Sequence, residues 1–201
     1  MRAFVIAMER EAVCLRPFLN PDDRLYVSGI GKVNAAAATM KAICEGADEI
    51  VNVGFSGGFG ADMEVGRVYG VERAVEYDFD LAKLNGTAIG VLDEYDTPYL
   101  PLEKTEGLER FAWFGGWKTL ATGDHFNDSE QDYTLITSVL GCSLRDMEGA
   151  AIAHVCRRTG VKCRSFKCVT NLAGSGSMTG QYERNLMLCG ERLTAAMREW
   201  L

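Results

Sequence analysis

The sequence predicts an α/β fold: a three-layer α/β/α sandwich around a mixed, largely parallel central sheet. Short runs of β-branched and aromatic residues alternate along the chain with stretches whose apolar residues recur at helical intervals, which is typical of strands joined by helices. Some strand-like runs are apolar throughout, as expected of strands that helices cover on both faces. The 201 residues, 47% of them hydrophobic, are enough for one large core. We therefore expect a single domain over residues 1–201.

Five segments of the N-terminal half are expected to form strands: residues 3–7, 25–28, 49–60, 66–80 and 87–92. The pattern predicts a helix over residues 10–19, directly after the first strand. The glycines of SGIGK open an Ala-rich stretch that should form a second helix and end at Gly46. Two strand and helix pairs therefore precede the third, most apolar strand.

The pattern weakens over residues 93–118, where we expect a loop or a short helix, and a strand should follow at residues 117–122. Three further elements are expected in the C-terminal part: a helix over 144–160 that ends at Gly160, a strand over 161–171, and an amphipathic helix over 182–201.

The charge balance excludes several classes of partner. The chain has 28 acidic and 21 basic residues, a net charge of −7, and so lacks the basic surface that nucleic acids and anionic membranes attract. No apolar run approaches the roughly 18 residues of a membrane span, and the first 13 residues carry charges without a small-residue cleavage site. We expect a cytoplasmic protein that binds neither nucleic acid nor membrane.

Cysteine and histidine spacing gives no sign of a metal site. The seven cysteines form no C-x-x-C pair, and only two histidines are present. We therefore expect no metal and no cofactor, and cysteines that are reduced and mostly buried.

Candidate site residues follow the expected strands. Ligands of open α/β sheets bind beyond the carboxyl ends of the strands. This rule selects five segments: residues 9–11, 28–32, 54–60, 122–127 and 170–176. Residues 146–148 add a carboxylate at the expected start of a helix. Taken alone, each is ambiguous, since Glu11 also suits the solvated first turn of a helix. Glu148 is more specific, because it borders an apolar helix face where a carboxylate needs a partner.

Order and spacing together are more informative. The segments AMEREA, SGIGKVNAA, GFSGGF, GDHF, RDMEGAAIAHVC and VTN resemble the nucleoside phosphorylase and nucleosidase superfamily, most closely the methylthioadenosine/S-adenosylhomocysteine nucleosidases. The resemblance covers nearly the whole chain. It implies that the protein cleaves the ribosyl N-glycosidic bond of a small-molecule purine nucleoside through an oxocarbenium-like sugar, and that it forms a homodimer in which a neighbour's loop completes the pocket.

The resemblance also implies roles for the sugar-side residues. Glu11 would hold and deprotonate the attacking water. Glu148 would accept hydrogen bonds from the 2′ and 3′ hydroxyls and offset the charge of the sugar, with Met147 packing beneath it.

On the base side, Phe126 would stack on the purine and the backbone of Asn127 would bind its edge. The GFSGGF loop, including Gly57, would wall the pocket with close backbone.

Asn171 departs from the adenine-specific relatives, which have an aspartate there that protonates purine N7. An amide cannot supply that proton, but it can accept from a protonated N7 and donate to an oxygen at position 6. We therefore expect a 6-oxopurine such as hypoxanthine, as in inosine or futalosine; futalosine hydrolase is similar in having asparagine at this position. The alternative is that Asn171 only caps a strand end and that activity is changed or lost.

Two further departures concern the sugar side. Phe55 stands where relatives have a small Thr or Ser, so its ring would either shrink the pocket or turn outward and leave Ser56 to act. The connection at residues 20–25 is short where relatives have a longer hairpin, which would alter the cover of the pocket or the dimer surface.

Water is the expected acceptor, since the arginine that phosphorylases of this type place before the third-strand glycines is replaced by Val51, Asn52 and Val53. A phosphorylase is the nearest alternative. Arg10 lies beside Glu11, but on a helix its side chain would point about 100° away from that of Glu11. A nucleoside-binding protein without turnover is the alternative from another class. The retention of both Glu11 and Glu148 favours an enzyme.

Overall fold

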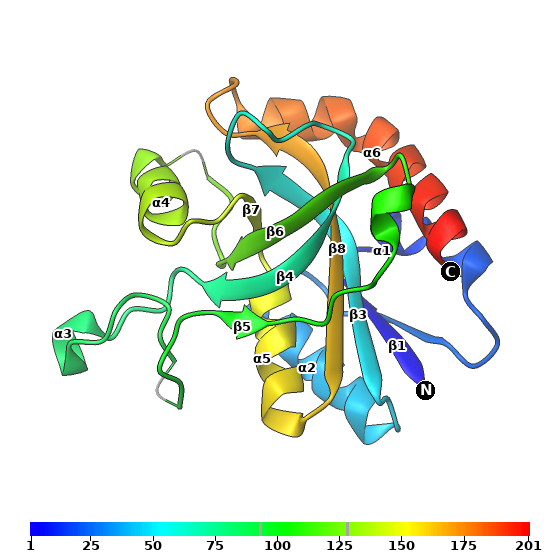
Figure 1. The fold of residues 1–201 in the computed structure, drawn as a ribbon, viewed down its shortest axis with the longest axis horizontal. Helices are drawn as coiled ribbons and strands as arrows, with labels where there is room; N and C mark the ends of the chain where they lie inside the picture. Colours follow the sequence, from blue (N-terminus) through cyan, green and yellow to red (C-terminus); the bar gives the residue numbers. More distant parts are fainter. Residues whose placement is uncertain (93, 128) are drawn as a thin grey trace.

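The computed structural model describes residues 1–92, 94–127 and 129–201, and it confirms the α/β prediction. Helices α2 (Lys32–Cys44) and α5 (Gly149–Thr159) pack together on one side of the sheet, and the long helix α6 (Met178–Trp200) covers the other (Figure 1). Each helix buries an apolar face against the strands, which gives three layers.

The described strands form one mixed sheet: β1 (Arg2–Ile6), β2 (Arg24–Val27), β3 (Glu49–Gly58), β4 (Val68–Glu76), β5 (Leu100–Pro101), β6 (Phe114–Thr122), β7 (Leu144–Asp146) and β8 (Lys162–Leu172). The order is β2-β1-β3-β7-β6-β4-β5, and β8 also pairs with both β3 and β4. The sheet therefore closes on itself through β3, β7, β6, β4 and β8. The pairs are parallel except β3–β7, β4–β5 and β4–β8.

Short helical segments occupy the connections: α1 (Glu9–Ala12), η1 (Arg16–Phe18), α3 (Ala82–Asn85), η2 (Leu108–Arg110), α4 (Glu130–Thr134) and a π-helical turn η3 (Leu135–Val139). The helix predicted over 10–19 is therefore wrong in length. Pro17 explains part of the difference, because a proline inside an α-helix has no N–H to donate and its ring clashes with the carbonyl four residues earlier, here that of Val13. The helix predicted to end at Gly160 does so, with Gly160 left-handed at φ +70°.

Two predictions of element type are also wrong. Residues 87–92 form no strand; Gly86 and Gly90 have φ of +76° and +81°, which interrupts an extended path. Leu144–Asp146 is strand rather than the start of a helix, because it pairs with β3 and β6. The helix begins only after Glu148, so Asp146 is the last residue of a strand and Glu148 lies in the connection between that strand and the helix.

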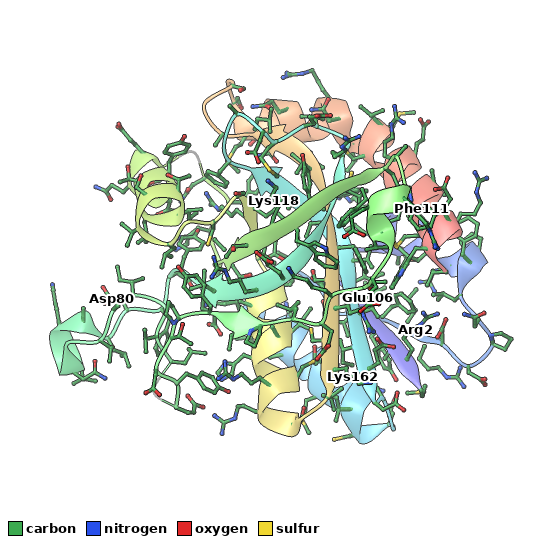
Figure 2. All side chains as sticks on the ribbon, in the orientation of Figure 1. Arg2, Asp80, Glu106, Phe111, Lys118 and Lys162 are labelled. Carbon is green, nitrogen blue, oxygen red and sulfur yellow. The ribbon has the colours of Figure 1, made fainter. Side chains whose placement is uncertain are left out.

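The core has two main parts, one on each side of the sheet. Six of the seven cysteines are buried, as predicted, and Cys44 is exposed. Phe111 stacks on Trp113, and the rings of Trp113, Phe114 and Trp117 meet edge to face in turn. The four rings pack on the α6 side of the core, where Phe111 lies near α6 (Figure 2). Core packing therefore accounts for this cluster. Within the described ranges, no helix has both the length and the apolar character needed to cross a membrane.

Candidate functional site

A small hollow with a cavity volume of about 40 Å³ opens where β3, β7 and β8 end. Residues from these strands and from the loop after β6 line it: Gly57, Phe59, His125, Phe126, Arg145, Asp146, Met147, Asn171, Ala173 and Met178. Four residues predicted from the sequence therefore meet around one space, namely Gly57, Phe126, Met147 and Asn171. The other five predicted residues do not line it, although two of them lie beside it.

Glu11 is one of these neighbours, and it is buried with only 3% of its surface exposed. Its Oε1 accepts a hydrogen bond of 2.8 Å from the backbone N–H of Phe55, and its Oε2 accepts one of 3.0 Å from that of Met8. A Cβ on Gly54 would lie 2.7 Å from Oε1, so a larger residue there would displace the carboxylate. Desolvation raises the pKa of Glu11, although the two backbone donors and Lys167 oppose the shift. A carboxylate with a raised pKa is suited to take a proton from water.

Glu148 is 7% exposed, and its Oε1 accepts a hydrogen bond of 2.9 Å from the backbone N–H of Gly31. Desolvation, together with the charge of Asp146, raises its pKa to about 7, and Glu11 adds to the shift. This bond explains the SGIGK segment: Gly31 has φ +99°, a conformation that aims its N–H at the carboxylate and that other residues rarely adopt.

Lys167 joins the acidic groups and was not predicted. Its ammonium lies 2.8 Å from Oδ2 of Asp146 and is almost fully buried. Desolvation would lower its pKa, but Asp146, Glu148 and Glu11 outweigh that effect and raise it. Asp146 is further held by the Thr122 hydroxyl at 2.6 Å. The alternation of side chains along β8 could have predicted that Lys167 faces the buried core. Nothing in its local sequence, however, predicts the ion pair with Asp146.

Asn171 lies within β8, opposite Gly57 of β3, and is buried at the wall of the hollow. Its Oδ1 accepts a hydrogen bond of 2.9 Å from the Thr170 hydroxyl. The amide Nδ2 is 3.1 Å from where a Cβ on Gly57 would lie. The side chain therefore faces the hollow, rather than only capping the strand.

Phe55 and Ser56 alternate across β3. The Phe55 ring is buried in the core on the α6 side and does not line the hollow. The bulky ring therefore does not reduce the volume of the hollow. The Ser56 hydroxyl is buried and has no hydrogen-bond partner among the residues that the structure describes. Such an orphaned hydroxyl is available to a ligand or a water.

The loop after β6 presents Phe126, which is 51% exposed. Its ring meets that of Tyr182 edge to face at 6.0 Å, and the Tyr182 hydroxyl lies 4.0 Å from the Met8 sulfur. Since the Met8 backbone binds Glu11, these contacts connect the hollow to the Glu11 carboxylate. Tyr182 was not among the predicted site residues.

Arg145 fixes the same loop through hydrogen bonds. Its guanidinium donates to the carbonyl oxygens of His125 at 2.7 Å and Asn127 at 3.2 Å, and to Oδ1 of Asn127 at 3.2 Å. Asn127 is thus fixed by its carbonyl and its side chain. Asp124, in the same loop, accepts from the backbone N–H of Lys32 at 2.8 Å and so caps α2.

The arrangement unites three buried carboxylates, one ammonium, an amide and an exposed aromatic ring around or next to the hollow. Carboxylates in a site largely closed to water are suited to stabilise a transient cation. The amide provides one donor and one acceptor for a heterocycle.

Comparison with known proteins assigns this chain to a family. The profile of the phosphorylase superfamily matches residues 24–200. The 5′-methylthioadenosine/S-adenosylhomocysteine nucleosidase of Marinomonas sp. (strain MWYL1) is 28% identical over 192 residues, which cover 92% of this chain and 82% of that protein.

Two solved structures share the fold. The 5′-methylthioadenosine/S-adenosylhomocysteine nucleosidase of Colwellia psychrerythraea 34H, in complex with adenine, matches with a TM-score of 0.84 and 26% identity over 100% of this chain and 96% of that one. Futalosine hydrolase of Helicobacter pylori strain 26695 matches with a TM-score of 0.83 and 19% identity, covering 100% and 97%. The chain therefore belongs to the phosphorylase superfamily.

Proposed function

We propose that this protein is a purine nucleosidase that hydrolyses the ribosyl N-glycosidic bond of a 6-oxopurine nucleoside, such as inosine or futalosine. The observation that carries the proposal is the pair of buried carboxylates, Glu11 and Glu148, which share the charge of Lys167 beside a hollow walled by Asn171. Nucleosidases among the similar proteins support the reaction class, and adenine in the Colwellia structure supports a purine.

In the proposed reaction, Glu11 accepts a proton from a water molecule that attacks the anomeric carbon. The bond between that carbon and the purine nitrogen breaks, and its electron pair leaves with the base. Glu148 is next to the sugar, where its negative charge stabilises the oxocarbenium-like state, and Met147 packs beneath the ring. The orphaned Ser56 hydroxyl is available to the water or to a sugar hydroxyl.

The base would occupy the hollow between Asn171 and Phe126. The ring of Phe126 is exposed and free to stack on a purine. Because Oδ1 of Asn171 accepts from Thr170, the amide N–H groups are the part of the side chain that faces Gly57, and they suit an acceptor oxygen at position 6.

Water, rather than phosphate, is the proposed acceptor. Asn52, which lies where phosphorylases of this type carry an arginine, is buried and donates to the carbonyl of Val5 at 3.0 Å while accepting from Ser165 at 3.1 Å. Arg10 is exposed and lines a different surface hollow, beside α6. Asn52 carries no charge, and Arg10 does not line the candidate hollow.

A release assay tests the proposal. The purified protein is incubated with inosine, guanosine, futalosine and methylthioadenosine, with and without phosphate, and free base is measured by chromatography. Hypoxanthine or guanine released independently of phosphate supports the nucleosidase. Release that requires phosphate and yields a sugar 1-phosphate identifies a phosphorylase. No base from any substrate identifies the nucleoside-binding alternative.

We also propose a homodimer in a cytoplasmic protein. The segment around α3 extends away from the sheet (Figure 1), Asp80 lies near its base (Figure 2), and Leu84 is 80% exposed. An extended loop with an exposed apolar residue is suited to reach a neighbouring copy. Sedimentation equilibrium should give twice the mass of the chain for the native protein and a lower mass for Leu84→Asp.

A further inference from the structure

Arg145 is a buried cation that the proposed mechanism leaves unused. Only 6% of its surface is exposed, yet it makes no ion pair with any residue in the described part of the chain. The nearest acid in sequence, Asp146, is bonded to Lys167. Three carbonyl-type oxygens of His125 and Asn127 and the face of the Tyr77 ring, 5.6 Å away, stabilise the guanidinium in part. A buried charge without a counter-ion costs stability, which favours a role toward a ligand.

The strand register places Arg145 and Asn171 on two sides of one glycine. Gly57 of β3 pairs with Arg145 of β7 on one side and with Asn171 of β8 on the other. Residues that are paired in this way point to the same face of a sheet, and two strand spacings put them about 9–10 Å apart. Because Gly57 has no side chain, the space between the guanidinium and the amide stays open, and all three residues line the same hollow.

We propose that Arg145 is a specificity-determining residue of the base site, which selects a purine with an acceptor oxygen at position 6 and stabilises the negative charge that this base gains as it leaves. The inference rests on the proposed function and deepens it. A flat ring between Asn171 and Arg145 meets N–H donors on two sides, which match the oxygen of a 6-oxopurine.

The same geometry disfavours adenine. Its 6-amino group needs an acceptor, but the amide N–H groups of Asn171 are donors. Arg145 already occupies one lone pair on each of the carbonyl oxygens of His125 and Asn127. The amino hydrogens would also face a positive charge. Sites that leave buried donors unpaired discriminate strongly between purines.

The charge of Arg145 also completes the electron balance of hydrolysis. Glu11 receives the proton of water, and the electron pair of the glycosidic bond goes to the base. Asn171 has no acidic proton to give, so the base departs as an anion and takes a proton from solvent afterwards. A fixed cation at the edge of the base stabilises that anion as it forms.

The test uses Arg145→Met, which removes the charge at similar length, and Arg145→Lys, which keeps it. Inosine and adenosine hydrolysis is measured, and binding of free hypoxanthine and free adenine is measured by titration calorimetry. Arg145→Met should lower kcat/KM for inosine about 10²-fold and weaken hypoxanthine binding about tenfold, while adenine binding changes less than about threefold. Arg145→Lys should recover part of both losses. Arg73→Met, which removes an exposed arginine stacked on Tyr99, is the matched control and should change neither purine.

Equal losses for hypoxanthine and adenine would overturn the inference, because a residue that only holds the loop in place affects the stacking of every purine alike. Tighter binding of adenine than hypoxanthine by the native protein would overturn it as well. If hypoxanthine binding depends on Arg145 but no nucleoside is cleaved, the inference holds and the proposed hydrolysis fails. Thermal unfolding of each variant confirms that the comparison is made between folded proteins.

Discussion

The buried carboxyl of Glu148 makes stability and activity change in opposite directions with pH. The pKa of Glu148 is raised from an ordinary value of 4.5 to about 7, with desolvation as the first cause and Asp146 as the second. Below pH 4.5 the folded and unfolded chains both carry the proton. Between pH 4.5 and 7 the unfolded chain ionises while the folded chain does not, so the free energy of unfolding falls as pH rises. At 1.36 kcal/mol for each tenfold change in acidity, the loss is about 3 kcal/mol.

Glu148→Gln isolates this effect, because glutamine keeps an oxygen for the Gly31 N–H and cannot ionise. Urea unfolding of both proteins at pH 4.5 and pH 8 should show that the variant gains about 3 kcal/mol relative to the native protein at the higher pH. In thermal unfolding this corresponds to about 6–12 °C for a chain of this size. Glu183→Gln, an exposed glutamate of α6, is the control and should show no such difference.

Activity should follow the ionised form. Since Glu148 must carry its charge to stabilise the sugar, kcat/KM should decrease on the acid side with a midpoint near pH 7. The variant should lose most of its activity at every pH. The reasoning is refuted if the stability difference between native protein and variant is the same at pH 4.5 and pH 8, since Glu148 would then titrate alike in both states.

Three further substitutions test the remaining parts of the site. Glu11→Gln should lower turnover about 10²-fold, because a glutamine cannot accept the proton of water; near-native turnover in a folded variant would remove Glu11 from the mechanism. Asn171→Asp restores an ionisable group beside N7 and should raise the ratio of adenosine to inosine cleavage; an unchanged ratio would contradict the assigned role of the amide. Gly57→Ala places a Cβ 3.1 Å from Nδ2 of Asn171 and should weaken purine binding about tenfold, measured by calorimetry, with Gly190→Ala of α6 as a control where the nearest neighbour of a Cβ, the Cys14 sulfur, is 3.8 Å away.

The sequence predicted the site residues that lie in short motifs at strand ends. It did not predict the residues whose role depends on which strands are neighbours in the sheet. Gly57, Met147 and Asn171 sit in short motifs at strand ends, and the structure gathers them around one hollow. Arg145 and Lys167 gave no such signal. Each lies inside a strand, and its importance depends on which strands neighbour it, namely the closure of the sheet through β7 and β8. That closure depends on tertiary contacts between distant segments.

The same limit explains the errors in element type. Leu144–Asp146 continues directly into an amphipathic helical pattern, and three residues are too few to establish a strand period. Only pairing with β3 and β6 decides the conformation, and it has a chemical consequence. A helix over these residues would have turned Asp146 and Glu148 to different sides, whereas the strand end lets Asp146 reach Lys167 while Glu148 meets Gly31.

Lys167 decides how the acidic charge of the site is used. The Lys167 ammonium lies within hydrogen-bond distance of Asp146, so it stabilises the negative charge of Asp146 most. It stabilises the negative charges of Glu11 and Glu148 only in part. Both glutamates therefore remain harder to ionise than they would be in water, and the folded enzyme is less stable for holding them. In the proposed mechanism, a sugar that becomes positive next to both carboxyl groups relieves this excess of negative charge at the moment of bond breaking. The crowded acidic groups thus destabilise the resting site and stabilise only the positively charged transition state. Such selective stabilisation gives faster turnover rather than tighter substrate binding.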